Sequence, residues 1–357
     1  METKEKAPSD IQMEIGRLLQ SKPNGEGVKA CLFNLIVYAH EPRRTQYLKD
    51  IVQTIMSQFP CRIIFIQANP SAKEDILNVR TSTVKSSDEH SIVCDQIFIE
   101  ASGNKINKVI FLLLPLFVPD LPIYLLWGED PTTENTILPH LQRFATRLII
   151  DSEATDDLQT FCWDIQNRMS STSIQIVDMN WARTGGWREV VAQIFDSPER
   201  FQQLTAAKMI EIFYNDCPSD VLLHPDTQAI YLQAWLASRL GWTFQKAEKQ
   251  NGSQVIFYQI GETIRQIKLT PKTNQNFQAE EIVEIYFQGP DYECNLKRIF
   301  LDQVQVHAAN QSQCVLPFVL IMPTLRSGRS FMQEIFYQKV SDHYAQVLKL
   351  ISLAKWS

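Results

Sequence analysis

The sequence predicts an α/β protein in which a doubly wound, mostly parallel sheet domain precedes an α+β domain with an antiparallel sheet. The chain has 357 residues, which is more than one hydrophobic core usually supports. Its first half alternates continuously apolar runs with helical runs, as expected of strands buried on both faces of a parallel sheet. Its second half instead contains several short alternating runs separated by turn signals, which is typical of an antiparallel sheet.

The first part of the chain divides into a tail and an α/β domain. Residues 1–24 are expected to form a polar tail and a short helix, because Ser9-Asp10-Ile11-Gln12 is a capping box. Residues 25–180 should form a Rossmann-like domain without a dinucleotide fingerprint. Its strands are expected at 30–38, 62–67, 79–85, 96–100, 122–127, 148–150 and 173–177, and its helices at 41–59, 105–116, 136–146 and 156–169. The strands at 79–85 and 96–100 should lie toward a sheet edge.

Residues 181–357 are expected to form the α+β domain. Helices are predicted at 187–195, 198–204 and 226–240, and a closing helix at 330–354. Ser197 before Pro198 should cap the second of these helices, and Gly241 should end the third. Strands are predicted at 209–214, 254–260, 263–269, 282–287, 296–301 and 315–322.

Composition and charge argue against several classes of protein. Hydrophobic residues make up 45% and charged residues 21%, so bulk disorder is not expected. The formal net charge is −6 with scattered Lys and Arg, whereas nucleic-acid and anionic-membrane surfaces need a clustered basic patch. The apolar run at 109–118 is about half as long as a bilayer requires. The seven cysteines are dispersed without a CxxC, and the first ten residues are polar, so a cytoplasmic location is expected.

The standard catalytic and cofactor signatures are missing, so no cofactor, metal or reaction is expected. The chain has neither a GxxxxGK[ST] loop nor a GxSxG elbow, and His40-Glu41 cannot begin an HExxH helix because position 44 is Arg44. The run at 25–30 imitates GxGxxA, but it precedes the first strand, whereas a dinucleotide fingerprint follows one. The alternative is an enzyme that binds a nucleotide or a sugar phosphate on the α/β layer.

The most unusual segment follows the last strand of the α/β layer. It holds two Trp and two Arg within eight residues, and these side chains are strongly enriched in interface hot spots. We therefore expect a partner-binding site formed by Asp178, Asn180, Trp181, Arg183, Trp187, Arg188 and Glu189. Wedging of the two domains by the Trp pair explains the pattern equally well. A catalytic acid and base pair of Asp178 and Glu189 is conceivable, but ion pairs with the neighbouring Arg residues explain these carboxylates better.

Two further clusters have simpler explanations. Trp235 and Trp242 flank the end of a helix and are expected to pack that helix onto the C-terminal sheet. Arg326 and Arg329 precede the closing helix, where they could bind an anion weakly through the helix N-terminus. A solvated loop is the more common state of such a pair.

Four stretches of the sequence match one family in order. They are 60–64, 114–122 running into Leu126-Trp127, 178–183 with Trp187-Arg188-Glu189 just after, and 235–242. On these stretches the chain resembles the OpcA family of glucose-6-phosphate dehydrogenase assembly proteins over nearly its whole length. The N-W-A-R string at 180–183, with W-R-E at 187–189, is the most specific of the four.

The resemblance implies a protein with no reaction of its own. OpcA-like proteins of bacteria bind glucose-6-phosphate dehydrogenase, support its oligomeric assembly and raise its activity, which feeds NADPH production in the oxidative pentose phosphate pathway. It therefore implies a non-catalytic assembly factor and allosteric activator, with that dehydrogenase as its partner and no small-molecule substrate. Photosynthetic members are linked to thioredoxin-type control through cysteines, and this sequence departs from them because no cysteine follows Cys314.

Overall fold

The computed structural model describes residues 31–85, 93–310, 316–322, 335–336 and 342–356. The chain forms two compact units. The first comprises residues up to Ala154 together with Thr172–Val177, and the second comprises Thr155–Ser171 together with the chain from Asp178 onward. The predicted helix within residues 1–24 lies outside the described residues, and so do Arg326 and Arg329. Within the part of the chain that is described, no helix is long and apolar enough to cross a membrane.

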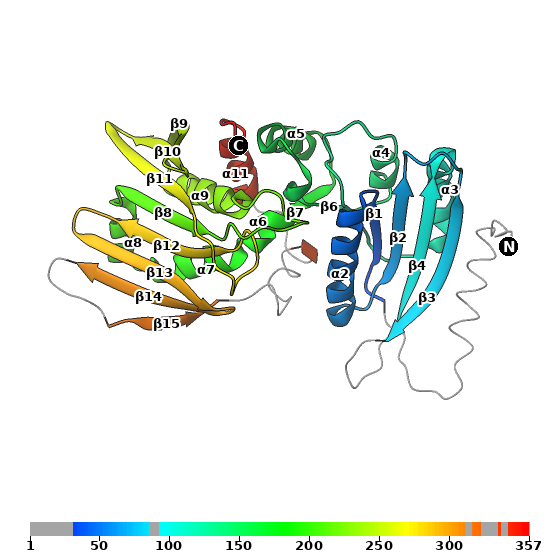
Figure 1. The fold of residues 1–357 in the computed structure, drawn as a ribbon, viewed down its shortest axis with the longest axis horizontal. Helices are drawn as coiled ribbons and strands as arrows, with labels where there is room; N and C mark the ends of the chain where they lie inside the picture. Colours follow the sequence, from blue (N-terminus) through cyan, green and yellow to red (C-terminus); the bar gives the residue numbers. More distant parts are fainter. Residues whose placement is uncertain (1–30, 86–92, 311–315, 323–334, 337–341, 357) are drawn as a thin grey trace. The chain divides into compact units, whose positions relative to one another are not determined.

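The first unit is built on a seven-stranded sheet with the order β3-β4-β2-β1-β5-β6-β7 (Figure 1). The central strand, β1, pairs in parallel with β2 on one side and with β5 on the other. All six residues of β1 are buried, which explains why its sequence is continuously apolar rather than alternating. The strands are β1 (Asn34–Ala39), β2 (Arg62–Asn69), β3 (Leu77–Lys85), β4 (Val93–Ser102), β5 (Ile123–Trp127), β6 (Arg147–Ile150) and β7 (Gln175–Asp178).

The predicted parallel architecture of this unit is confirmed, and two of its helices differ from prediction. β3 is the edge strand and runs antiparallel to β4, as the polar alternation of its sequence suggested. The helix α2 (Pro42–Gln58) forms where expected. The helix expected at 105–116 is instead divided into η1 (Gly103–Lys108), α3 (Val109–Leu113) and η2 (Leu114–Leu116), with Pro115 inside the last turn. The helix expected at 136–146 is only α4 (Leu138–Gln142).

The second unit is built on an eight-stranded sheet with the order β15-β14-β13-β12-β8-β11-β10-β9. Its neighbouring strands pair in antiparallel fashion except for β8 and β11, which are parallel. The strands are β8 (Met209–Tyr214), β9 (Thr243–Gln250), β10 (Ser253–Ile260), β11 (Thr263–Pro271), β12 (Ile282–Gln288), β13 (Tyr292–Phe300), β14 (Gln303–Asn310) and β15 (Phe318–Ile321). The predicted antiparallel sheet is therefore confirmed.

Two of these strands were not predicted. β9 reads Thr-Phe-Gln-Lys-Ala-Glu-Lys-Gln and buries none of its residues, so it carries no apolar alternation. β14 alternates only over Gln303–Val306, where Val304 and Val306 are buried, and this run is too short to mark a strand by itself. Both strands are placed by pairing with a neighbour, which a single-sequence pattern does not record.

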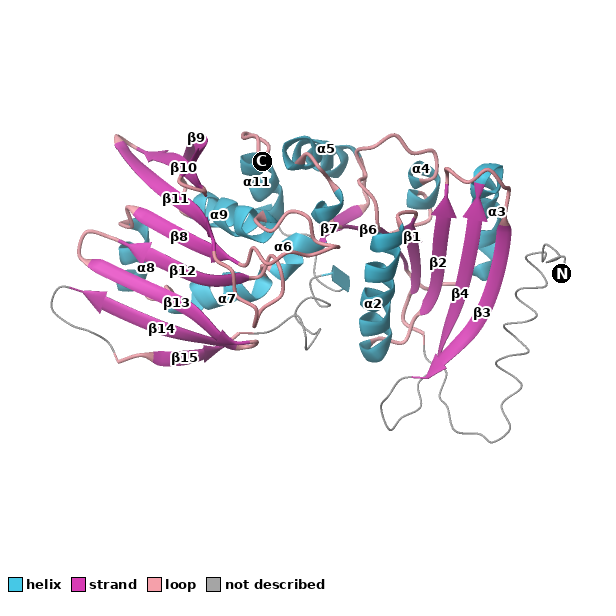
Figure 2. Ribbon diagram, viewed as in Figure 1, coloured by secondary structure: helices cyan, strands magenta, loops and turns pink. Residues whose placement is uncertain are grey.

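Helices pack on one face of the second sheet, as Figure 2 shows for α7, α8 and α9. Ser197 caps α8 through its hydroxyl, as predicted, and Gly241 follows α9 with a positive φ of 67°. Within the segment at 178–189, α6 forms where no helix was predicted, and α7 begins two residues before the helix predicted at 187–195. The helices are α5 (Leu158–Ser171), α6 (Met179–Arg183), α7 (Gly185–Ile194), α8 (Pro198–Thr205), α9 (Thr227–Arg239) and α11 (Asp342–Ile351).

Candidate functional site

The carboxyl ends of β1 and β5 lie side by side in the first sheet, and we call this place the ligand edge. The chain leaves β1 toward one side of the sheet through β2 and reaches the other side through β5, so the strand order reverses between them. Open α/β sheets bind ligands in the crevice at such a switch point. In dinucleotide-binding proteins, the backbone amides of the turn after the first strand and of the following helix face a phosphate there.

In this chain, a carboxylate of the protein itself lies against those amides. Oε1 of Glu129 accepts hydrogen bonds from the backbone N–H of His40 at 2.6 Å and from that of Glu41 at 3.3 Å. Nδ1 of His40 lies 3.4 Å from the same oxygen. Glu129 is 7% exposed and follows β5 by two residues, so it enters the turn between β1 and α2 from the neighbouring strand. The amides of the turn therefore donate to a carboxylate that belongs to the protein itself.

The residue before this carboxylate must be glycine. A Cβ at Gly128 would lie 2.2 Å from Cδ1 of Leu48 and 2.7 Å from the carbonyl oxygen of Tyr38. The rings of Tyr38 and Trp127 stack beside it with centroids 4.2 Å apart. Burial raises the pKa of Tyr38 to about 12, so its hydroxyl stays neutral near pH 7. Tyr38 and Trp127 are both buried, so these rings are part of the core beside the turn.

Arg44, in the first turn of α2, is bound within the protein. Nη2 of Arg44 lies 2.9 Å from Oδ2 of Asp151, and its Nε donates to the carbonyl oxygen of Gly128 at 3.2 Å. The two side chains are 6% and 0% exposed. Because breaking a buried pair of this kind leaves an uncompensated charge, Arg44 is poorly suited to release Asp151 for a phosphate.

The sequence-predicted partner site lies in the second unit, and much of it is interior. Asp178 is fully buried, and its carboxylate accepts hydrogen bonds from the hydroxyl of Tyr231 at 2.6 Å and that of Tyr344 at 3.4 Å. The same carboxylate caps α6 by accepting from the backbone N–H of Asn180 at 2.7 Å. Burial, followed by the charge of Asp178, raises the pKa of both tyrosines well above 10. Asp178 therefore ties α6 to α9 and α11.

The two tryptophans of the segment are core residues. Trp181 and Trp187 are 2% and 3% exposed. Trp187 donates its indole N–H to the carbonyl oxygen of Ile282 on β12 at 3.1 Å, and Trp181 packs against Tyr344 with centroids 5.7 Å apart. Both rings contact partners inside the second unit, so neither ring is itself exposed for binding.

Arg183, Arg188 and Glu189 are the members of the segment that reach solvent. The guanidinium of Arg188 lies 3.5 Å from the centre of the Trp181 ring and donates to the Trp181 carbonyl oxygen at 3.0 Å. Arg183 donates to Oδ1 of Asn180 at 2.5 Å. Both arginines are partly exposed, and Glu189 is exposed on α7. The structure thus brings Asp178, Asn180, Trp181, Arg183 and Arg188 together and leaves Glu189 at the surface.

Several residues of these two regions escaped the sequence analysis. Gly128 and Glu129 directly follow a predicted strand, and that position was the available signal. Tyr231 and Tyr344 reach Asp178 from distant helices, so no local pattern marks them. Trp242, expected in the core, is buried, and the centroid of its ring lies 5.9 Å from that of Tyr258. No group of His, Cys, Asp and Glu able to hold a metal ion is found among the described residues.

Solved structures share this two-unit architecture at low sequence identity. A 3-ketoreductase from Actinomadura kijaniata, in complex with TDP-benzene and NADP, matches with a TM-score of 0.50 and 11% identity, covering 90% of this chain and 95% of that one. A super-repressor mutant of Gal80p from Saccharomyces cerevisiae matches with a TM-score of 0.50 and 8% identity, covering 91% and 95%. The fold therefore belongs to a class of two-domain α/β proteins that includes both an NADP-bound reductase and a repressor. Such a fold does not decide function.

Family models narrow this class. The glucose-6-phosphate dehydrogenase subunit N-terminal domain matches residues 52–167, and the corresponding C-terminal domain matches residues 174–318. OpcA proteins named for the OxPP cycle are similar as well. That of Synechocystis sp. is 27% identical over 198 residues, which are 54% of this chain and 40% of the relative. That of Synechococcus elongatus is 26% identical over 249 residues, which are 66% of this chain and 53% of the relative.

The two family models together match most of the chain, from residue 52 to residue 318. The chain belongs to the OpcA family of glucose-6-phosphate dehydrogenase assembly proteins. It spans about half the length of the curated relatives that it matches.

Proposed function

We propose that this chain is a non-catalytic assembly factor and allosteric activator of glucose-6-phosphate dehydrogenase. Membership of a family named for association with that enzyme supports the choice of partner.

The observation that carries the non-catalytic part of the proposal is the position of Glu129. The backbone amides of His40 and Glu41 donate to its carboxylate at 2.6 and 3.3 Å. A phosphate of NADP would need the same amides and would meet a negative charge that is already there. The ionic bond of Arg44 with Asp151 also occupies one cation in the first turn of α2. The ligand edge is thereby better suited to stabilising the fold than to binding a nucleotide.

The segment at 178–189 remains our proposed partner site, with its parts assigned separate tasks. In this proposal Asp178, Asn180, Trp181 and Trp187 fix the two helices from inside. Arg183, Arg188 and Glu189 supply the solvent-facing groups that contact the enzyme. Arginine on a rigid, buried platform is well suited to this, because little conformational freedom is lost when it binds.

An activator of this kind works by binding the competent state of the dehydrogenase more tightly than other states. A coupling free energy of about 1–3 kcal/mol would change the affinity for substrate by roughly five- to a hundredfold. The activation experiment measures the rate of the purified dehydrogenase from the same organism against glucose 6-phosphate concentration, with and without this protein, and the mass of the mixture. We expect a complex and a lower KM or a higher kcat. Unchanged kinetics and no complex would refute the proposal.

The rival function is that of an enzyme acting on a nucleotide or a sugar phosphate. A test of ligand binding by this protein alone distinguishes it from the proposed function. A ligand at a hundred times its Kd stabilises the folded state by about 2.7 kcal/mol. We expect no shift of the melting temperature with NADP, ATP or glucose 6-phosphate. A saturable shift of several degrees with any of them would favour the rival.

A further inference from the structure

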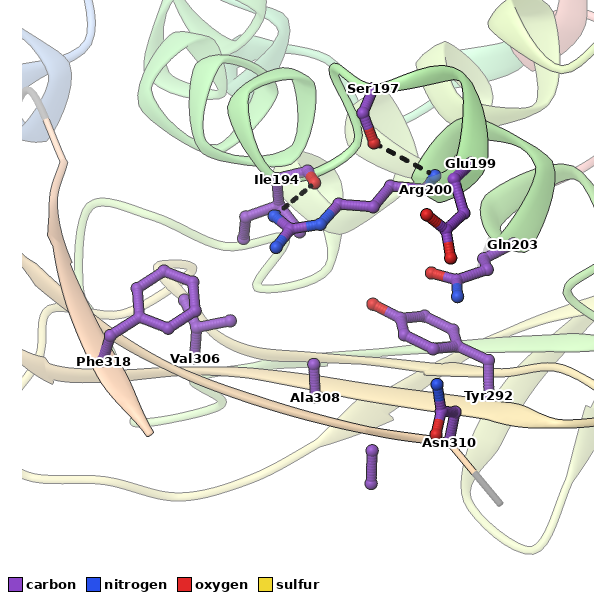
Figure 3. A pocket seen from close by; sticks show the side chains of 11 residues that line it. Ile194, Ser197, Glu199, Arg200, Gln203, Tyr292, Val306, Ala308, Asn310 and Phe318 are labelled. Carbon is purple, nitrogen blue, oxygen red and sulfur yellow. Dashed lines mark hydrogen bonds between the residues drawn. The ribbon is translucent and has the colours of Figure 1, made fainter. Parts of the chain in front are cut away.

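The eight-stranded sheet has two faces, and α7, α8 and α9 pack on one of them. Phe195, directly after α7, packs against Phe287 of β12 with ring centroids 5.1 Å apart. Figure 3 shows Tyr292 of β13 and Ala308 of β14 pointing toward α8. Successive side chains of a strand point to opposite faces, so the residues next to these in their strands belong to the other face. We call this other face the open face.

The open face carries exposed apolar side chains near its β15 edge. Val319 and Ile321 alternate along β15 and are 47% and 65% exposed. They pair with Gln305 and Gln303 of β14, which alternate with the buried valines of that strand, so both lie on the open face. Phe300, at the end of β13, pairs with Gln303 from the other side and is 65% exposed. Large apolar side chains exposed together on one surface are characteristic of protein interfaces.

The charges of the open face balance one another. Three ion pairs lie on it, with N–O distances of 2.9, 2.6 and 2.7 Å: Lys268 with Glu211, Lys272 with Glu284, and Lys246 with Glu248. Lys297 and Glu293 of β13 are exposed on the same face and also offset each other. The whole chain, by contrast, carries a formal charge of −6. Copies of an acidic chain repel one another on average, and a balanced face is the surface at which that repulsion is smallest.

The size of the open face matches the area that a stable dimer buries. The sheet has eight strands. With about 4.8 Å between strands and about 3.3 Å per residue, eight strands of roughly seven residues cover about 800 Å². A standard interface buries about the same area, roughly 800 Å², on each partner. Phe213, Phe257 and Tyr286 lie half-buried on this face and supply the aromatic side chains in which interfaces are enriched.

We infer that two copies of this chain associate through their open faces, with sheet stacked on sheet about a twofold axis. The aromatic side chains and the apolar group of Val319, Ile321 and Phe300 lose their contact with water in this dimer. Each ion pair stays within its own copy, so neither copy has to neutralise a charge of the other. The dimer goes beyond the proposed function, because its formation requires no dehydrogenase.

Sedimentation equilibrium of the purified full chain, over a range of protein concentrations, tests this dimer. Gln266→Lys with Gln288→Lys places two cations on the open face, where both exposed side chains neighbour Met209 of the central strand β8. Ile321→Lys places one cation among the exposed apolar side chains. The matched control is Gln193→Lys with Gln202→Lys, which adds the same charge at exposed glutamines of α7 and α8. Melting temperatures of all proteins show whether each variant is folded.

We expect the wild type to reach twice the mass of the chain and both open-face variants to raise the dimer Kd by roughly tenfold or more, because like charges then meet across the twofold axis. The control should dimerise like the wild type. A wild type that remains monomeric at every concentration overturns the inference, as does a dimer that the open-face variants leave intact or that the control weakens equally. A monomer whose open-face variants lose only their binding to the dehydrogenase assigns this face to the enzyme, which overturns the dimer and leaves the proposed function standing.

Discussion

The starts of helices α2 and α8 differ in how their polar groups are used. Before α2, the backbone amides of His40 and Glu41 donate to Glu129, which is 7% exposed. At α8, Ser197 caps the helix locally by accepting from the backbone N–H of Arg200 at 3.3 Å. Glu199, two residues after this cap, is exposed. A polar group that is satisfied from within contributes to stability, and one left at the surface remains available for binding.

Replacement of a buried side chain should give the largest change in the free energy of unfolding. Replacing Trp187 by Ala removes a ring that is 3% exposed and its hydrogen bond to Ile282, so the free energy of unfolding should fall by about 3–5 kcal/mol. Urea denaturation followed by circular dichroism measures this. The matched control is Trp163→Ala, because Trp163 is 60% exposed and its loss should cost under about 0.5 kcal/mol. Equal stabilities of the two variants would contradict the interior placement of Trp187.

Removal of the internal anion should have the next largest effect. Glu129→Ala leaves the two amides of the turn without their charged acceptor, at a cost of about 1.5–3 kcal/mol. Thermal unfolding of the variant, compared with that of Glu134→Ala on the exposed loop before α4, tests this. If both variants melt together with the wild type, the turn is satisfied by other groups, and the contrast with α8 is lost.

Alkaline pH should weaken the second unit through its buried phenols. Tyr231 and Tyr344 have pKa values raised well above 10, because burial and then the Asp178 charge disfavour the phenolate. The folded state keeps these protons where the unfolded state loses them, so the stabilisation is complete below pH 10 and is lost above it. Each tyrosine contributes about 1.36 kcal/mol per pH unit in that range. Urea midpoints from pH 8 to 11.5 should fall, and less steeply in Tyr231→Phe. An equal slope in this variant would contradict the assignment.

The smallest changes in the free energy of unfolding are expected at the start of α8. Ser197→Ala removes one local cap and should cost about 1 kcal/mol. Glu199→Gln should alter stability by less than about 0.5 kcal/mol, since the side chain is exposed. Melting temperatures of both variants measure the difference. A loss at Glu199→Gln as large as that at Glu129→Ala would show that the two helix starts are equivalent after all.

Much of the fold was predictable because its signals are local. The apolar run of β1 and the hydroxyl cap of α8 each lie within a few consecutive residues. β9 was missed because a polar edge strand is defined by pairing with β10 rather than by its own side chains. The segment at 178–189 was recognised as unusual, yet its burial depends on Ile282 and Tyr344, which are distant in sequence. Glu129 was missed for the same reason, because the two backbone amides that donate to its carboxylate lie about 90 residues away in the sequence.

The assignment of α5 to the second unit bears on how this protein can be divided. α5 follows β6 in the chain, yet its Gln159 donates to the carbonyl oxygen of Ser352 after α11 at 3.0 Å. The backbone consequently passes from one unit to the other at 154–155, 171–172 and 177–178. A truncation at residue 180 would deprive α11 of the helix beside it and expose the buried side chains of Phe161, Cys162 and Ile165. Fragments intended for separate expression should therefore transfer 155–171 to the C-terminal piece, joined by a linker, instead of using a single cut.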